Sequence, residues 1–205
     1  MIKHIIFDMG GVLIRFDPQY FIERLGIRGE DATLLYQEVF RSLEWVQLDR
    51  GTISEQDAIK QMMQRIPLCL QDAVEKLVSM WDRPILPIEG MAALIGKLKS
   101  AGYGIYLLSN ASLRQPDYWN RVPGQELFDG TLISADVHLL KPEAEFYHLM
   151  LEKFSLKAEE CIFIDDNACN IEGAVNCGIN GVVFHGDTAK LRHILEENFS
   201  ITLSQ

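Results

Sequence analysis

Short apolar runs that end in polar residues or glycine recur along the chain and predict the strands of one sheet. Ile5, Ile6 and Phe7 lead directly into Asp8. Runs of the same kind cover 105–108, 161–164 and 181–184, and a weaker one covers 130–134. Continuous apolar strands that alternate with helices are typical of a mostly parallel sheet covered on both faces. The pattern therefore predicts an α/β fold.

Helical periodicity fills much of the chain between these runs. Residues 88–101 carry apolar side chains at helical spacing and stop at Gly102, and residues 168–177 stop at Gly178 in the same way. Glycine is the residue that most often follows a helix, because it adopts the left-handed conformation without strain. These two segments are predicted to be helices that cover the sheet.

Residues 17–86 have a different texture, with helical periodicity and no strand run. Asp17 precedes a proline and Ser54 lies three residues before an acid, and both arrangements are helix N-terminal signals. We therefore predict an all-helical insert of three to five helices at 17–86. The α/β core is predicted to comprise residues 1–16 and 87–205.

The net charge of the chain narrows the classes of partner to be expected. Lys and Arg number 19 against 29 Asp and Glu, which gives a net charge of −10. Such a charge opposes non-specific binding to nucleic acid or anionic lipid, so we expect neither as a partner. An anionic substrate would have to be held by a local positive feature.

Cysteine usage and hydropathy indicate the compartment. The four cysteines are scattered, contain no Cys-x-x-Cys pair and are expected to be reduced core thiols. The first apolar stretch, at 2–7, is far shorter than the hydrophobic region of a signal peptide, and no later run approaches the length of a membrane span. We expect a cytoplasmic protein.

Polar residues gather where the predicted strands end. The carboxyl ends of parallel strands meet at one edge of a sheet, and ligands bind outside that edge. The side chains that should converge there are Asp8, Ser109, Asn110, Lys141, Asp165 and Asp166. Residues remote in sequence are thus predicted to form one site.

The composition of this edge suggests phosphate chemistry with a metal. Asp8, Asp165 and Asp166 would repel one another unless a cation compensated, and Mg²⁺ favours a few carboxylates together with a phosphate oxygen. Gly10 and Gly11 would permit a tight turn in which a backbone carbonyl faces the metal, and Lys141 would add positive charge. A carboxylate beside a phosphoryl group is a candidate nucleophile that forms an aspartyl-phosphate.

Four segments in these places resemble the motifs of a known superfamily. Residues 7–13, 107–110, 141–142 and 163–167 resemble, in order, the four motifs of the haloacid dehalogenase (HAD) superfamily. The helical insert sits where that superfamily's first-type cap belongs, so the resemblance implies a Rossmann-like HAD core with an inserted cap. The closest resemblance is to bacterial members of the α-D-glucose-1-phosphate phosphatase type, which implies a sugar-phosphate substrate such as a hexose 1-phosphate.

The resemblance also implies roles around the metal and the phosphate. Asp8 would be the nucleophile and a Mg²⁺ ligand, together with the carbonyl of Gly10 and the side chain of Asp166. Asp165 and Asn170 would lie next to these ligands. The residues implied to bind the phosphoryl group of a small phosphorylated substrate are Ser109, Asn110 and Lys141, of which Lys141 would also orient the nucleophile.

One position departs from the pattern. Most phosphatases of the superfamily have a second Asp two residues after the nucleophile, which protonates the leaving group, whereas this chain has Gly10. A good leaving group, an acid from the insert, ordered water or the substrate could compensate. Asp17 and His185 are conceivable replacements, and Arg114 and Trp119 are candidates for reaching substrate.

Two alternatives to a phosphatase remain open from the sequence. A 2-haloacid dehalogenase needs no general acid, because halide leaves as a stable anion, although the pair Asp165-Asp166 suits a metal that dehalogenation does not require. The other alternative is a non-catalytic phosphate-binding or regulatory protein that keeps the fold without turnover.

Overall fold

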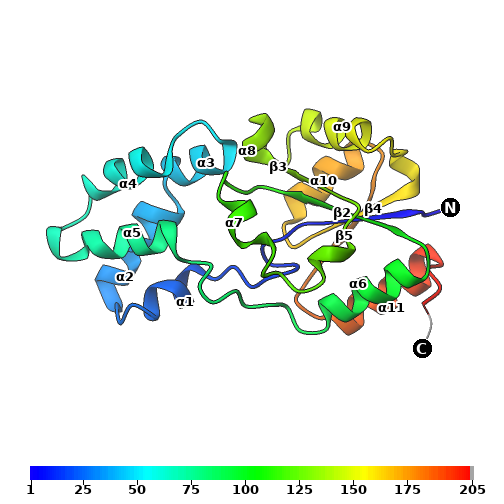
Figure 1. Cartoon of the computed structure of the whole chain (residues 1–205), viewed down its shortest axis with the longest axis horizontal. Helices are drawn as coiled ribbons and strands as arrows, with labels where there is room; N and C mark the ends of the chain where they lie inside the picture. The colour runs from blue at the N-terminus through cyan, green and yellow to red at the C-terminus, as the bar shows by residue number, and fades with distance from the viewer. Residues whose placement is uncertain (204–205) are drawn as a thin grey trace.

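A computed structural model describes residues 1–203 and contains one five-stranded parallel sheet. The order across the sheet is β3-β2-β1-β4-β5, which places β1 at the centre (Figure 1). The strands are β1 (His4–Phe7), β2 (Gly104–Ser109), β3 (Gly130–Ile133), β4 (Cys161–Asp165) and β5 (Asn180–Val183). The predicted α/β fold and all five predicted strands are confirmed.

Alternate side chains of the central strand enter two separate layers of core. Ile5 and Phe7 pack with apolar residues of α6 and α11 on one face of the sheet. Ile6 packs with residues of α9 and α10. These two helices cover the other face (Figure 1). Because both faces are covered, β1 must be apolar at every position between His4 and Asp8. The four covering helices are α6 (Met91–Ser100), α9 (Ala144–Lys153), α10 (Ala168–Asn176) and α11 (Thr188–Phe199).

The glycine stops predicted for two helices are present. Gly102 follows α6 with φ of 90° and Gly178 follows α10 with φ of 83°, both in the left-handed region. The first of these helices begins three residues later than predicted, because Gly90, not Ile88, occupies the N-cap position of α6. Two short helices of the core, α7 (Gln115–Trp119) and α8 (Ser134–Val137), follow β2 and β3.

Helices joined by short turns and loops make up the predicted insert, which lies to one side of the sheet (Figure 1). Asp17 accepts a hydrogen bond from the Tyr20 amide at 3.0 Å, and Ser54 accepts one from the Asp57 amide at 3.1 Å, as the capping signals predict. The α-helices are α1 (Pro18–Glu23), α2 (Gly29–Leu35), α3 (Leu43–Arg50), α4 (Glu55–Met63) and α5 (Gln71–Ser79), and a π-helical turn covers Tyr36–Phe40. These helices share an apolar cluster of their own.

Two neighbouring segments connect the insert to the core. The Arg15 amide donates to the Leu86 carbonyl at 2.7 Å, and the Ile88 amide donates to the Leu13 carbonyl at 2.9 Å. The chain thus leaves and re-enters the core through two extended segments that are hydrogen-bonded to each other. We retain 17–86 as the proposed boundary of this unit and call it the cap.

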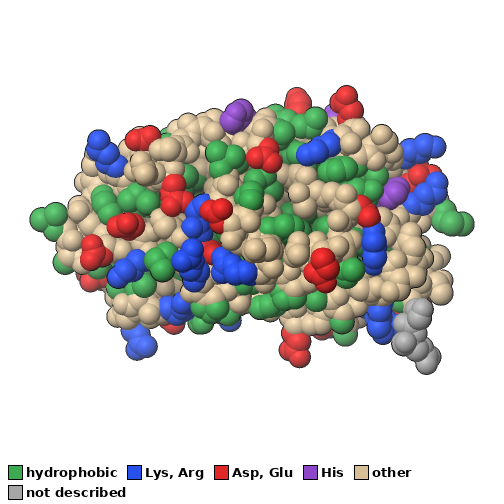
Figure 2. Space-filling view, in the orientation of Figure 1, with side chains coloured by type: hydrophobic (Ala, Val, Ile, Leu, Met, Phe, Trp, Pro, Cys, Tyr) green, Lys and Arg blue, Asp and Glu red, His purple; other side chains and the backbone are tan. Residues whose placement is uncertain are grey.

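The structure corrects one expectation about the cysteines. All four are free, as predicted, but only Cys161 is a buried core thiol, whereas Cys69 and Cys169 are exposed. Among residues 1–203, no helix is both long and apolar enough to cross a membrane. Acidic and basic side chains are interspersed over the face seen in Figure 2.

Candidate active site

The carboxyl edge of the sheet brings the predicted polar residues together. Asp8 directly follows β1, Asp165 ends β4 and Ser109 ends β2, while Lys141 enters from the loop after α8. Lys141 Nζ lies 2.8 Å from Asp8 Oδ1 and 2.6 Å from Asp165 Oδ2. Ser109 Oγ donates a hydrogen bond to Asp8 Oδ1 at 2.8 Å. One carboxylate oxygen of Asp8 is therefore held by two donors.

Asn110 fixes the backbone that carries Lys141. The Lys141 amide donates to Asn110 Oδ1 at 2.9 Å, and Asn110 Nδ2 donates to the Lys141 carbonyl at 3.2 Å. These reciprocal bonds use both ends of the side-chain amide. Asn110 therefore positions Lys141, while its side chain also lines the cavity described below.

Lys141 is a buried cation between two buried carboxyl groups. Only 5% of the residue is exposed. Burial by itself lowers the pKa of the Lys141 ammonium, but the charges of Asp8 and Asp165 outweigh it and raise that pKa above its ordinary value. Lys141 therefore stays charged, and its ammonium group is held between the two carboxyl groups.

Three carboxyl groups lie close enough to share a cation. One oxygen from each of Asp8, Asp165 and Asp166 lies within 4.8 Å of the others. Asp165 is already occupied, because it accepts bonds from Lys141, from the Asn167 amide at 2.8 Å and from Asn170 Nδ2 at 3.0 and 3.1 Å. Asp166 is exposed, which leaves it and Asp8 as the carboxyl groups with room for a metal.

The electrostatics of these groups fit a divalent cation. Burial and the negative charges of Asp8 and Asp165 raise the pKa of Asp166 to about 6. Burial also raises the pKa of Asp8, against the opposing charge of Lys141. A cation at this place would favour the charged form of both carboxyl groups, and carboxylate oxygens are the ligands that Mg²⁺ prefers.

A tight turn after β1 brings backbone against Asp166. Gly11 has φ of 77°, and its amide donates to the Ile14 carbonyl at 2.8 Å. A Cβ atom at Gly11 would overlap the carboxylate of Asp166. Glycine is therefore required at position 11 on two grounds, whereas a Cβ at Gly10 would meet Phe16 only at 3.5 Å, an ordinary contact.

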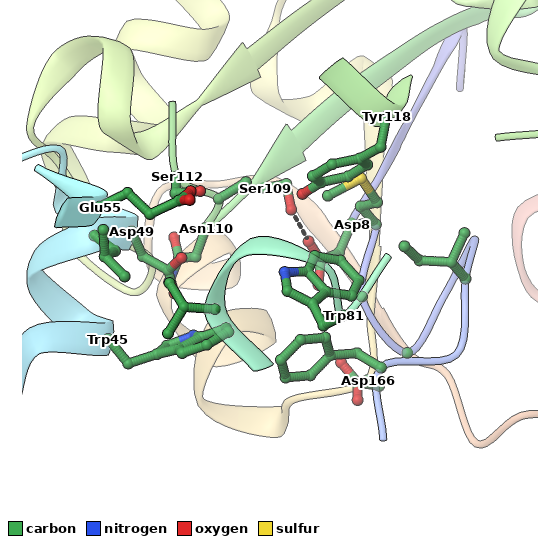
Figure 3. A pocket seen from close by; sticks show the side chains of 18 residues that line it. Asp8, Trp45, Asp49, Glu55, Trp81, Ser109, Asn110, Ser112, Tyr118 and Asp166 are labelled. Atoms are coloured by element: carbon green, nitrogen blue, oxygen red, sulfur yellow. Dashed lines mark hydrogen bonds between the residues drawn. The ribbon is translucent and has the colours of Figure 1, made fainter. Parts of the chain in front are cut away.

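A cavity of about 250 Å³ opens between this edge and the cap. Asp8, Ser109, Asn110 and Asp166 line its core side. Figure 3 shows the labelled cap residues, including Trp45 and Asp49, around the same cavity. Its apolar lining includes Ile14, Phe16, Trp45, Leu48, Val78 and Trp81, and its other polar lining includes Asp49, Glu55, Ser112 and Tyr118.

Comparison with protein families identifies the chain. The family model of the haloacid dehalogenase-like hydrolases matches residues 2–178, which is most of the chain. The chain belongs to this family. The predicted HAD membership is confirmed, and the cavity of this HAD-like hydrolase lies at the carboxyl edge of the sheet, as in other parallel α/β proteins.

The relatives of this HAD-like hydrolase include phosphatases. A sesquiterpene phosphatase, astK, of Aspergillus oryzae is 30% identical over 191 residues, which covers 88% of each chain. A D-ribitol-5-phosphate phosphatase of Bacteroides thetaiotaomicron is 24% identical and covers 83% of this chain and 86% of its own. The crystal structure of an HAD family enzyme from the same bacterium, in complex with magnesium and inorganic phosphate, has a TM-score of 0.73 at 21% identity and covers 93% and 99% of the two chains.

Within residues 1–203, seven residues considered from the sequence are not part of this cavity lining. Three of them, Lys141, Asp165 and Asn170, form the hydrogen-bonded network that holds Asp8. The other four are Asp17, Arg114, Trp119 and His185. Arg114 pairs with Asp82 and, at 3.4 Å, with Glu55. Trp119 packs edge-on against Phe128, with ring centroids 5.2 Å apart. Asp17 caps α1. His185 is exposed at the end of β5. Asp17 and His185 therefore do not replace the acid that is missing at Gly10.

Sequence reasoning missed the part of the site that the cap contributes. Trp45 and Trp81 pack against the apolar cluster of the cap, as hydrophobic anchors do, and both also line the cavity. The sequence pattern does not single out Asp49, although the sequence holds one signal for it. Asp49 lies in the last turn of α3, where a negative charge is disfavoured by the helix dipole, and such local conflicts often mark functional positions.

Proposed function

We propose that this HAD-like hydrolase is a Mg²⁺-dependent phosphatase of small phosphorylated metabolites that works through an aspartyl-phosphate. The observation that carries the proposal is that Asp8 and Asp166 line one cavity while buried Lys141 holds Asp8, with its Nζ 2.8 Å from Asp8 Oδ1. The phosphatase relatives support it. The proposal includes a sugar phosphate such as a hexose 1-phosphate as substrate.

Three groups would hold the metal: the carboxylates of Asp8 and Asp166 and the carbonyl of Gly10. Mg²⁺ bound there would polarise a phosphate oxygen and neutralise charge that develops during transfer. Asp165 would keep the ligand set in place indirectly, because it binds Lys141 and Asn170. A hydrogen-bonded network next to the proposed ligands thus holds them in position.

In the proposed reaction, Asp8 attacks phosphorus as the bond between phosphorus and the leaving oxygen breaks. Lys141 and Ser109 both hold Oδ1 of Asp8, which leaves Oδ2 as the attacking atom. Water then attacks phosphorus, the acyl-phosphate bond breaks, and phosphate leaves with Asp8 restored. The cap would exclude bulk water and bind the organic group.

The apolar lining of the cavity favours a second class of substrate beside sugar phosphates. Ile14, Phe16, Trp45 and Trp81 present an apolar and aromatic wall to the cavity. Aromatic rings pack against sugar rings, but such a wall also accommodates an entirely apolar group, for example a terpenoid chain. An apolar phosphate monoester is therefore our second candidate, and it has support from the relative that is a sesquiterpene phosphatase.

Phosphate release with and without Mg²⁺ tests the proposed function. We expect activity with Mg²⁺ and a loss of at least about 10²-fold in EDTA, reversed by added Mg²⁺, because metal polarisation contributes several kcal/mol. The substrates compared are hexose 1-phosphates, hexose 6-phosphates and a prenyl monophosphate. Halide release from a 2-haloacid that EDTA does not affect would favour the dehalogenase alternative, and phosphate binding without hydrolysis would favour the non-catalytic one.

Gly11→Ala is expected to weaken Mg²⁺ binding by about 10- to 100-fold, as loss of support around a metal ligand does. The added methyl would displace Asp166 and strain a backbone with positive φ. Titration calorimetry with Mg²⁺ measures the effect. Gly10→Ala is the matched control, because its methyl has space and no positive φ; equal affinities for the two variants would refute the placement of Asp166.

A further inference from the structure

The missing acid at Gly10 leaves a gap in the proposed phosphatase reaction. A phosphate ester of an ordinary alcohol needs a proton on its leaving oxygen, and Gly10 has no side chain to supply one. Besides Asp8, the carboxyl groups that line the cavity within residues 1–203 are Asp49, Glu55 and Asp166. Asp166 belongs to the proposed metal site. The other two, Asp49 and Glu55, belong to the cap.

Asp49 is held over the site by contacts on both sides of it. Ser134 Oγ of the core donates to the Asp49 carbonyl. Arg50, the next residue, binds Glu143 of the core through two bonds of 2.5 and 3.2 Å and donates to the His138 carbonyl at 3.1 Å. The carboxyl end of α3 is therefore docked on the core although α3 belongs to the cap.

Gly51 makes this docking close. It has φ of 72°, and a Cβ atom there would overlap the backbone of Ala135 in α8. The backbone on either side of Asp49 is thus fixed, and its side chain enters the cavity from the wall opposite Asp8 (Figure 3). A rigid backbone is what a proton donor needs if it is to reach the same atom in every cycle.

The surroundings of Asp49 favour its protonated form. Burial and the negative charge of Asp8 raise the pKa of Asp49 to about 8, against the charge of Lys141, and no hydrogen bond to its carboxyl group contributes. A neutral carboxyl near pH 7 can donate a proton. Glu55 differs, because it accepts from Ser79 Oγ at 2.7 Å and pairs with Arg114.

We propose that Asp49 is the general acid and base of this phosphatase and supplies from the cap the carboxyl group that Gly10 lacks. As Asp8 attacks phosphorus, the proton of Asp49 passes to the leaving oxygen, which departs as an alcohol. The Asp49 carboxylate then takes a proton from the water that attacks the aspartyl-phosphate. Phosphate leaves, and Asp49 is protonated again.

This proposal rests on the proposed function and widens its range of substrates. With Asp49 as the acid, a poor leaving group such as the alkoxide of a hexose 6-phosphate can depart. Without an acid, only esters with good leaving groups would react. The dependence of the first turnover on the leaving group therefore distinguishes Asp49 as a proton donor from Asp49 as a purely structural residue.

The test compares Asp49→Asn with wild type on 4-nitrophenyl phosphate and on an alkyl phosphate that wild type hydrolyses. Rapid-quench measurement gives the rate of the first release of alcohol. We expect a fall of about 10²- to 10⁴-fold for the alkyl phosphate but less than about tenfold for the nitrophenyl ester, which needs no acid. The nitrophenyl ester should then show a burst followed by slow turnover, because water activation is lost.

Glu55→Gln is the matched control, and it should change the first turnover of both esters by one common factor. Asp49→Ala should show the same selective loss, although it introduces no side-chain amide. Thermal unfolding reports whether each variant is folded. An equal loss for both esters in Asp49→Asn and Asp49→Ala, or no loss, would overturn the role of Asp49. Failure of the proposed function is separate, since wild type would then release no phosphate with Mg²⁺.

Discussion

Asp8→Asn is expected to reduce Mg²⁺-dependent phosphate release by at least about 10³-fold, because removal of a nucleophile eliminates the covalent route. The fold should survive. Asn has the shape of Asp, and its amide oxygen can still accept from Ser109 and Lys141, which lie 2.8 Å from the Asp8 oxygen. Lys141 also keeps its ion pair with Asp165.

The measurement is steady-state phosphate release together with circular dichroism during thermal unfolding. Asp72→Asn is the control, because Asp72 is exposed on α5 of the cap. It changes the net charge of the chain by the same amount and should leave turnover unaffected. Full activity of Asp8→Asn would remove the proposed mechanism, whatever the substrate is.

Lys141→Met is expected to impair both activity and stability. Removing one partner of a buried ion pair typically costs about 3–5 kcal/mol, because the other charge remains buried without compensation. Here two carboxyl groups, Asp8 and Asp165, would lose the same cation. The pKa of Asp8 would rise further, so the residual activity should shift to higher pH as well as fall by about 10²- to 10³-fold.

Denaturant unfolding and a pH–rate profile measure these effects. Lys3→Met is the matched control, since Lys3 forms an exposed pair with Glu160 at 2.7 Å and exposed pairs contribute only about 0–1 kcal/mol. A Lys141→Met protein as stable and as active as this control would contradict the electrostatic account of the site.

The sheet and the core side of the site follow from the sequence. Each predicted strand is an apolar run, and each ends in a residue that chain geometry sends to the same edge. The pattern of runs alone therefore groups Asp8, Ser109 and Asp165. The structure agrees, because Ser109 contacts Asp8 and Lys141 joins Asp8 to Asp165. Parallel strands permit this inference because their direction is shared.

The cap side of the site does not follow from the sequence. Helical periodicity indicates which side chains face the apolar cluster of the cap, but it does not indicate how the cap sits on the core. Trp45 packs on Phe16 and Phe40 within that cluster and also lines the cavity, so its periodicity is that of an ordinary core residue. Asp49 is placed by contacts of Arg50 and Ser134 that join segments remote in sequence.

Chemical trapping of the phosphorylated residue tests directly whether Asp8 is the nucleophile. Wild-type enzyme is quenched during turnover of a good substrate with Mg²⁺ and treated with borohydride, which reduces an aspartyl-phosphate to homoserine. Peptide mass spectrometry then locates the change. We expect homoserine at position 8 alone, and no such change when EDTA replaces Mg²⁺ during the incubation with substrate. Reduction at another carboxyl group, or substrate turnover that leaves Asp8 unmodified at every quench time, would contradict that role.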